Sequence, residues 1–137
     1  MKKLTQEELD KLVETHQLFK SSKGKLGRPA SFIDLDLSDL SLEEGLLKST
    51  AFTNCLFKNF NFKGAKLKHI AFRDCKFINT DFTNTYINKC LIEDCDLSTS
   101  ILKGLHFKES LINNSLLNGS NVIYLELTEQ HILKIVK

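Results

Sequence analysis

The stretch AFTNCLFKNFNFKGAKLKHI, residues 51–70, repeats one pattern of five residues four times. Phe or Leu returns at every fifth position, at Phe52, Phe57, Phe62 and Leu67. The same phase extends without exception over twenty positions that are all Phe, Leu, Ile or Val: Phe32, Leu37, Leu42, Leu47, Phe52, Phe57, Phe62, Leu67, Phe72, Phe77, Phe82, Ile87, Ile92, Leu97, Leu102, Phe107, Ile112, Leu117, Val122 and Leu127. A period of five matches neither a helix, at about 3.6 residues per turn, nor the alternation of a strand. The pattern therefore predicts a repeated unit made of a short extended piece and a corner.

A second position of each unit is also restricted. Two residues before each centre, fourteen of the twenty positions are Ala, Gly, Ser, Thr or Cys, and the other six are larger and apolar. Asn, Asp and Gly gather two residues after the centre, where a corner requires turn-forming residues. We expect the centre and the residue two before it to point inward, and the other three positions to lie outside.

These units resemble the pentapeptide-repeat family, whose consensus is A(D/N)LXX and which is matched here by AKLKH, TDFTN, CDLST and SNVIY. The resemblance covers residues 30 to about 127, and the opening residues are similar to leaders of many bacterial members. It implies an all-β solenoid, a right-handed quadrilateral β-helix with four pentapeptides in each coil and about five coils here.

The segments outside the repeat look like caps for the two ends of the solenoid. Thr5 and Glu8 form the pattern of a capping box, which predicts a helix over about residues 6–20. We expect residues 1–29 to be a capping helix and linker, 30–127 the β-helix and 128–137 a C-terminal cap. This last segment is either a short helix or a further strand, because Ile132 keeps the phase of five.

Three of the four cysteines, Cys55, Cys75 and Cys95, recur every twenty residues. One coil per twenty residues places them in a column at the strand spacing of about 4.8 Å. No four-ligand zinc site forms from such a column, because the first and third sulfurs would be about 10 Å apart. A disulfide between neighbours is disfavoured by parallel Cβ vectors and by a reducing cytoplasm. We interpret the cysteines as small packing residues and predict no cofactor and no metal.

The candidate structural core consists of these three cysteines and the centres of the middle coils, namely Phe52, Phe57, Phe62, Leu67, Phe72, Phe77, Phe82, Ile87, Ile92, Leu97, Leu102 and Phe107. The four histidines are scattered, the recurring acids sit at corners, and the glycines obey the repeat. The sequence therefore indicates no catalytic residues, and we expect no enzyme.

The charge excludes some partners. Residues 30–125 carry ten Lys/Arg against eleven Asp/Glu, and the whole chain has a formal net charge of +2. No apolar run is long enough to span a bilayer, and acids occupy the place where a signal peptide needs an apolar core. We expect a cytoplasmic protein without membrane contact, and neither a broad basic field for nucleic acid nor a polyanion.

Two outward surfaces are candidates for binding. A basic strip is formed by Lys48, Lys66, Lys68 and Lys108, with Tyr86 and His106 beside them, and it suits an acidic protein or nucleic acid unless it is simply a solvated face. Outward apolar residues increase toward the C-terminus and suggest a homodimer or a partner contact: Ala71, Leu91, Leu111, Leu116, Ile101 and Ile123.

Three classes of function follow. The first is a non-catalytic interaction or scaffold module with an unknown protein partner. The second is implied by the resemblance, since dimeric members of this family resemble B-form DNA, bind DNA gyrase and protect it from quinolones. Such mimicry requires a strongly negative rod, which the near-neutral repeats do not supply. The third, an enzyme, has no motif to support it.

Overall fold

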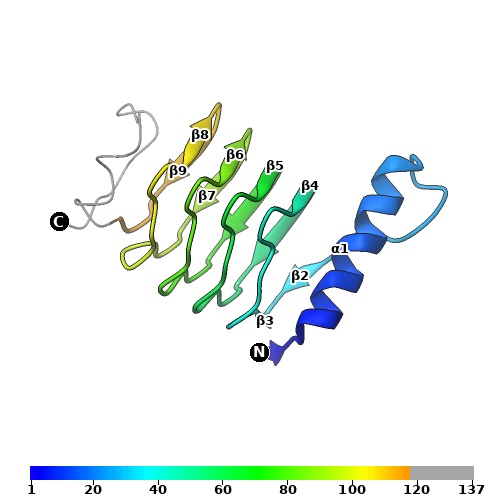
Figure 1. The fold of residues 1–137 in the computed structure, drawn as a ribbon, viewed down its shortest axis with the longest axis horizontal. Helices are drawn as coiled ribbons and strands as arrows, with labels where there is room; N and C mark the ends of the chain where they lie inside the picture. The colour runs from blue at the N-terminus through cyan, green and yellow to red at the C-terminus, as the bar shows by residue number, and fades with distance from the viewer. Residues whose placement is uncertain (118–137) are drawn as a thin grey trace.

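The structure of the chain, a computed structural model, describes residues 1–117. One helix lies across the end of a stack of parallel coils (Figure 1). The helix is α1 (Gln6–Ser21), and the strands are β1 (Lys2–Lys3), β2 (Phe32–Ile33), β3 (Leu35–Asp36), β4 (Leu46–Thr53), β5 (Lys66–Arg73), β6 (Tyr86–Asn88), β7 (Leu91–Glu93), β8 (His106–Lys108) and β9 (Leu111–Asn113). This helix is not long and apolar enough to cross a membrane, and residues 1–117 contain no other.

Each coil takes twenty residues, because the strands from β4 to β9 each pair in parallel with residues twenty places earlier in the chain. Phe52 of β4 pairs with Phe72 of β5, and Ile92 of β7 pairs with Ile112 of β9. The described residues build about four coils, fewer than the five predicted, because the centres Val122 and Leu127 lie outside them. The expected cap at 128–137 lies outside them too, so the division of the chain into three segments stays a prediction.

The centres of the units form the core of the solenoid. Between residues 32 and 82 there are eight phenylalanines, seven at centres and one, Phe60, two residues before a centre. All eight rings are buried. They stack from coil to coil: Phe57 lies 4.9 Å from Phe77 between ring centroids, and Phe62 lies 5.0 Å from Phe82. The predicted core residue Phe107 is an exception, since it is only partly buried and packs against the cluster from its margin.

The corners of the coils require left-handed backbone. Fifteen residues other than glycine have a positive φ, and fourteen of them, all except Lys23, lie two places after a centre. At one such corner the residue is Gly104, with φ +70°. A Cβ atom there would lie 2.2 Å from Asn84 Oδ1, so the side chain of one coil rests directly on the glycine of the next.

The N-terminal edge of the solenoid is covered by α1. The predicted capping box is present, since Thr5 Oγ1 accepts from the backbone N–H of Glu8 at 3.1 Å and the Thr5 N–H donates to Glu8 Oε1 at 3.0 Å. This backbone hydrogen bond from Thr5 holds the pKa of Glu8 below its usual range. Just before the helix, β1 adds to β3 as a short parallel strand.

Polar side chains of α1 hydrogen bond to the open backbone of the first coil. The Gln6 amide both donates to the Ser41 carbonyl and accepts from the Ser41 N–H, each at 2.8 Å. His16 is buried; its Nδ1 accepts from the Ala30 N–H at 2.9 Å and its Nε2 lies 2.7 Å from the Lys48 carbonyl oxygen. Because Nδ1 accepts, Nε2 carries the proton and donates. The helix thus satisfies backbone groups that would otherwise be an unpaired sheet edge.

Candidate binding face

One side of the solenoid brings the predicted basic strip together. We call it the lysine face: residues 46–49, 66–69, 86–89 and 106–109, which include β6, β8 and the first parts of β4 and β5. The parallel register arranges its outward residues in two columns. The first column is Leu46, Lys66, Tyr86 and His106, and the second is Lys48, Lys68, Asn88 and Lys108.

A groove of about 850 Å³ lies over these two columns and is lined by residues of both. Its floor is the ladder of strands, whose inward centres at this point are Leu67, Ile87 and Phe107. Along β5 and β6 the strand backbone is paired on both sides and offers few free donors or acceptors to a ligand. Recognition in this groove therefore depends on its side chains.

The four lysines of the strip, Lys48, Lys66, Lys68 and Lys108, form no ion pair with any residue between 1 and 117. Three of them are exposed and Lys68 is partly so. Lys48 and Lys68 are direct neighbours in the register. Like charges directly opposite each other on paired strands are destabilising. The fold therefore keeps a stack of unneutralised cations that its own stability does not favour.

Two further features complete the groove. The rings of Tyr86 and His106 stack on each other, with centroids 4.4 Å apart and planes within 5°. In the second column, between Lys68 and Lys108, the Oδ1 atom of Asn88 is buried and has no hydrogen-bond partner among the described residues. A buried acceptor without a donor costs free energy, so a ligand N–H would be favourable at this atom once the side chains that cover it move aside.

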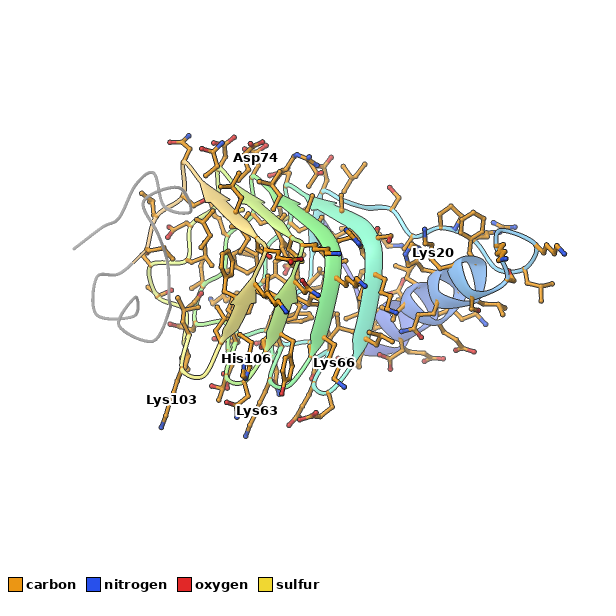
Figure 2. All side chains as sticks on the ribbon, turned by 90° about the horizontal axis from the view of Figure 1, so that it is seen from above. Lys20, Lys63, Lys66, Asp74, Lys103 and His106 are labelled. Carbon is orange, nitrogen blue, oxygen red and sulfur yellow. The ribbon has the colours of Figure 1, made fainter. Side chains whose placement is uncertain are left out.

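Charge is segregated around the solenoid. The lysine face carries five lysines against one acid, Glu109, which lies 3.9 Å from Lys89 in an ion pair. The adjoining face, residues 31–34, 51–54, 71–74, 91–94 and 111–114, carries four acids and one arginine. In Figure 2, Lys63, Lys66, Lys103 and His106 project from one side of the coils and Asp74 from the other. The near-zero net charge of the repeats therefore conceals that lysines and acids are concentrated on different faces.

The predicted apolar surface lies on the adjoining face and next to it. Ala71, Leu91 and Leu111 stand in one column by the register. Leu111 and Ile101 are exposed, whereas Ala71, Leu91 and Leu116 are partly buried. Ile123 lies outside the described residues. Of the five described members of this predicted surface, two are therefore exposed, and its role as an interface stays a prediction.

The cysteines are buried free thiols, and the Cys75 thiol donates to the Phe52 carbonyl at 3.4 Å. Hydrogen bonding to Cys55 and Cys95, together with burial, raises the pKa of Cys75 well above its usual range, and burial raises that of Cys90. The thiols of Cys75 and Cys90 are therefore held in the protonated form, which is not the nucleophile. Within residues 1–117 no three His, Cys, Asp or Glu side chains are grouped to hold a metal ion.

Asn88 was not among the candidate residues predicted from the sequence. It occupies the lysine column in register with Lys68 and Lys108, so completing the column by its twenty-residue spacing would have included it. The burial of its Oδ1 and the groove itself depend on how neighbouring side chains pack, which the spacing does not contain.

Comparison with known proteins places the chain in a family. A profile of pentapeptide repeats, with eight copies, matches the overlapping stretches 46–84, 55–93 and 67–104. Together with the unbroken phase of five, this match over residues 46–104 shows that the repeats of this chain are pentapeptide repeats of that family. No curated protein matches the sequence.

Solved structures show the same fold. A trypsin-treated QnrB1, a plasmid-mediated fluoroquinolone resistance protein, aligns at 24% identity and a TM-score of 0.58 over 64% of this chain. The alignment spans 46% of that protein, less than half its length. A pentapeptide repeat protein from the thylakoid lumen of Arabidopsis thaliana aligns at 18% identity and a TM-score of 0.51, over 69% of this chain and 73% of its own. The expected right-handed quadrilateral β-helix is confirmed.

Proposed function

We propose that this chain is a non-catalytic interaction module that binds a partner protein through its lysine face. The observation that carries the proposal is the charge segregation: five lysines and one acid on this face, against five Lys/Arg and ten Asp/Glu on the rest of residues 30–117. A rigid ladder holds these cations in fixed columns. Complementary charge across an interface speeds encounter and selects partners.

A photocrosslinking experiment tests which face binds. Benzoylphenylalanine is placed at Tyr86, on the lysine face, and in a matched variant at Ile78, which lies outside the core on a different side. Both are expressed in the source organism and irradiated. We expect one discrete adduct with a protein from the Tyr86 position and none from Ile78. An adduct from Ile78 alone, or no adduct from either position, would contradict the proposal.

Protection of DNA gyrase is a second candidate, favoured by the fold likeness to QnrB1. The charge argues against it, since replacing phosphates requires a negative surface and the groove here is lined by lysines. The test is supercoiling by purified gyrase, with and without a quinolone, while this protein is titrated. We expect no change at micromolar concentration. Inhibition or protection there would show that a near-neutral repeat rod can mimic DNA.

A further inference from the structure

The geometry points to a ligand class for the groove: an acidic segment of a partner protein, whose carboxylates meet the lysine columns and whose backbone N–H meets Asn88. This inference rests on the proposed function, because it names the chemistry of the partner at the same face. Four observations carry it: the unpaired lysines, the groove that they line, the orphaned Asn88 acceptor and the stacked pair of rings.

The lysines set the charge and the length of the ligand. Lys48 and Lys108 lie three coils apart in one column, which at the strand spacing is about 14 Å. An extended peptide covers that length with about four to five residues at about 3.3 Å each. Because none of these lysines has an anion among the described residues, a bound carboxylate gains an interaction without breaking an existing one.

Asn88 distinguishes a peptide from a simple polyanion. Its buried Oδ1 can only be satisfied by a donor, and every peptide unit except proline carries an N–H. A phosphate backbone carries none. A ligand that supplies both carboxylates and N–H groups along one strand satisfies the lysines and this amide together.

The aromatic pair argues against a nucleic acid. Proteins that hold single strands stack bases on exposed ring faces. Here the faces of Tyr86 and His106 are turned to each other at 4.4 Å, which leaves no room for a base between them.

Fluorescence anisotropy with a labelled peptide of eight glutamates, and a serine peptide of equal length, tests the inference on the purified full chain. We expect the glutamate peptide to bind and the serine peptide not to bind. Binding should weaken as salt rises from about 50 to about 300 mM, because the attraction is screened. A triple variant, Lys66→Gln, Lys68→Gln and Lys108→Gln, should weaken it at least about tenfold.

The matched control removes three exposed lysines elsewhere, Lys11→Gln, Lys58→Gln and Lys76→Gln, with the same change in net charge. We expect this variant to bind nearly as the parent does. Equal losses in both triple variants would reduce the effect to net charge and overturn the inference. Asn88→Leu should weaken binding by about two- to tenfold, the effect of one hydrogen bond, without altering the salt dependence; an unchanged affinity would remove Asn88 from the site.

Two other occupants are outcomes of the same experiment. Tighter binding of a labelled single strand of eight thymidines than of the glutamate peptide would overturn the inference in favour of nucleic acid. Self-association in sedimentation velocity that the lysine-face triple variant abolishes would make a second copy of the chain the occupant. If Tyr86 gives a crosslinked partner but the glutamate peptide does not bind, this inference fails and the proposed function stands.

Discussion

The two sides of a single strand obey opposite energetics in this molecule. In β5, Leu67 points inward and stacks between Leu47 and Ile87, whereas Lys68 points outward beside Lys48. Stacking like on like is favourable inside, because each apolar side chain buries the next. Outside, the same stacking places like charges opposite each other and is unfavourable. An inward column is therefore explained by its contribution to folding stability. An outward column of lysines is not, which is our reason to assign it to binding.

The largest expected effect lies inside. Phe57 is fully buried and its ring contacts five other phenylalanine rings, among them Phe52 and Phe77. Phe57→Ala should lower the free energy of unfolding by about 3–5 kcal/mol, through lost burial and the cavity left behind. Denaturant unfolding measures this. The adjacent outward change, Lys58→Ala, should stay within about 0.5 kcal/mol. Similar losses at both positions would break the distinction between the two sides.

The inward columns were the part that sequence could predict. Each centre packs on the centres twenty residues before and after it, so a single phase of five contains all of the information, and the cysteine column follows from the same spacing. The capping box was equally local, since Thr5 and Glu8 lie three residues apart. Phe107 departs from the pattern, because burial also depends on what surrounds a position.

The hydrogen bonds between α1 and the first coil, which cap the N-terminal end of the solenoid, could not be predicted in this way. Gln6, His16 and Gln17 of α1 donate to backbone carbonyls of the first coil, at Ser41, Lys48 and Leu46. These bonds depend on how the helix lies across the edge, and no periodicity in either segment encodes that placement. The same holds for the groove, which is a property of two columns together.

Truncation of His16 tests this edge and should have the second largest effect. His16→Ala removes a buried side chain and leaves the Ala30 N–H and the Lys48 carbonyl without their partner in a partly buried place. We expect a loss of about 2–3 kcal/mol in unfolding free energy, because unsatisfied buried groups retain their desolvation cost. Glu14→Ala, an exposed change on the same helix, is the control. Equal stability of both variants would mean that α1 does not cap the coil.

The corners join the inward and outward positions of each coil, and a substitution at Gly104 tests how much their backbone conformation contributes to stability. Gly104→Ala should cost about 1–2 kcal/mol, because a Cβ atom is unfavourable at φ +70°. Part of that loss should come from the contact with Asn84, which Asn84→Ala in the same chain would relieve. A double-mutant cycle from thermal or denaturant unfolding separates the two. Strict additivity would show that the coils do not touch through this pair.

The smallest expected effect, with the opposite sign, lies on the lysine face. Lys68→Gln removes one member of the Lys48–Lys68 pair, so the unfolding free energy should rise by a few tenths of a kcal/mol, about the size of a like-charge cross-strand pair. The gain should shrink as salt is added, because the repulsion is screened.

Lys58→Gln is the control for that gain, since the residues twenty places before and after Lys58 are Ser38 and Ile78 and offer no like charge. It should leave stability unchanged at every salt concentration. A loss of stability in Lys68→Gln would show that the lysine column supports the fold and would remove the energetic reason to assign it to binding. A gain in stability combined with weaker binding of an acidic peptide would instead mean that the fold tolerates this repulsion for the sake of its ligand, as binding sites commonly do.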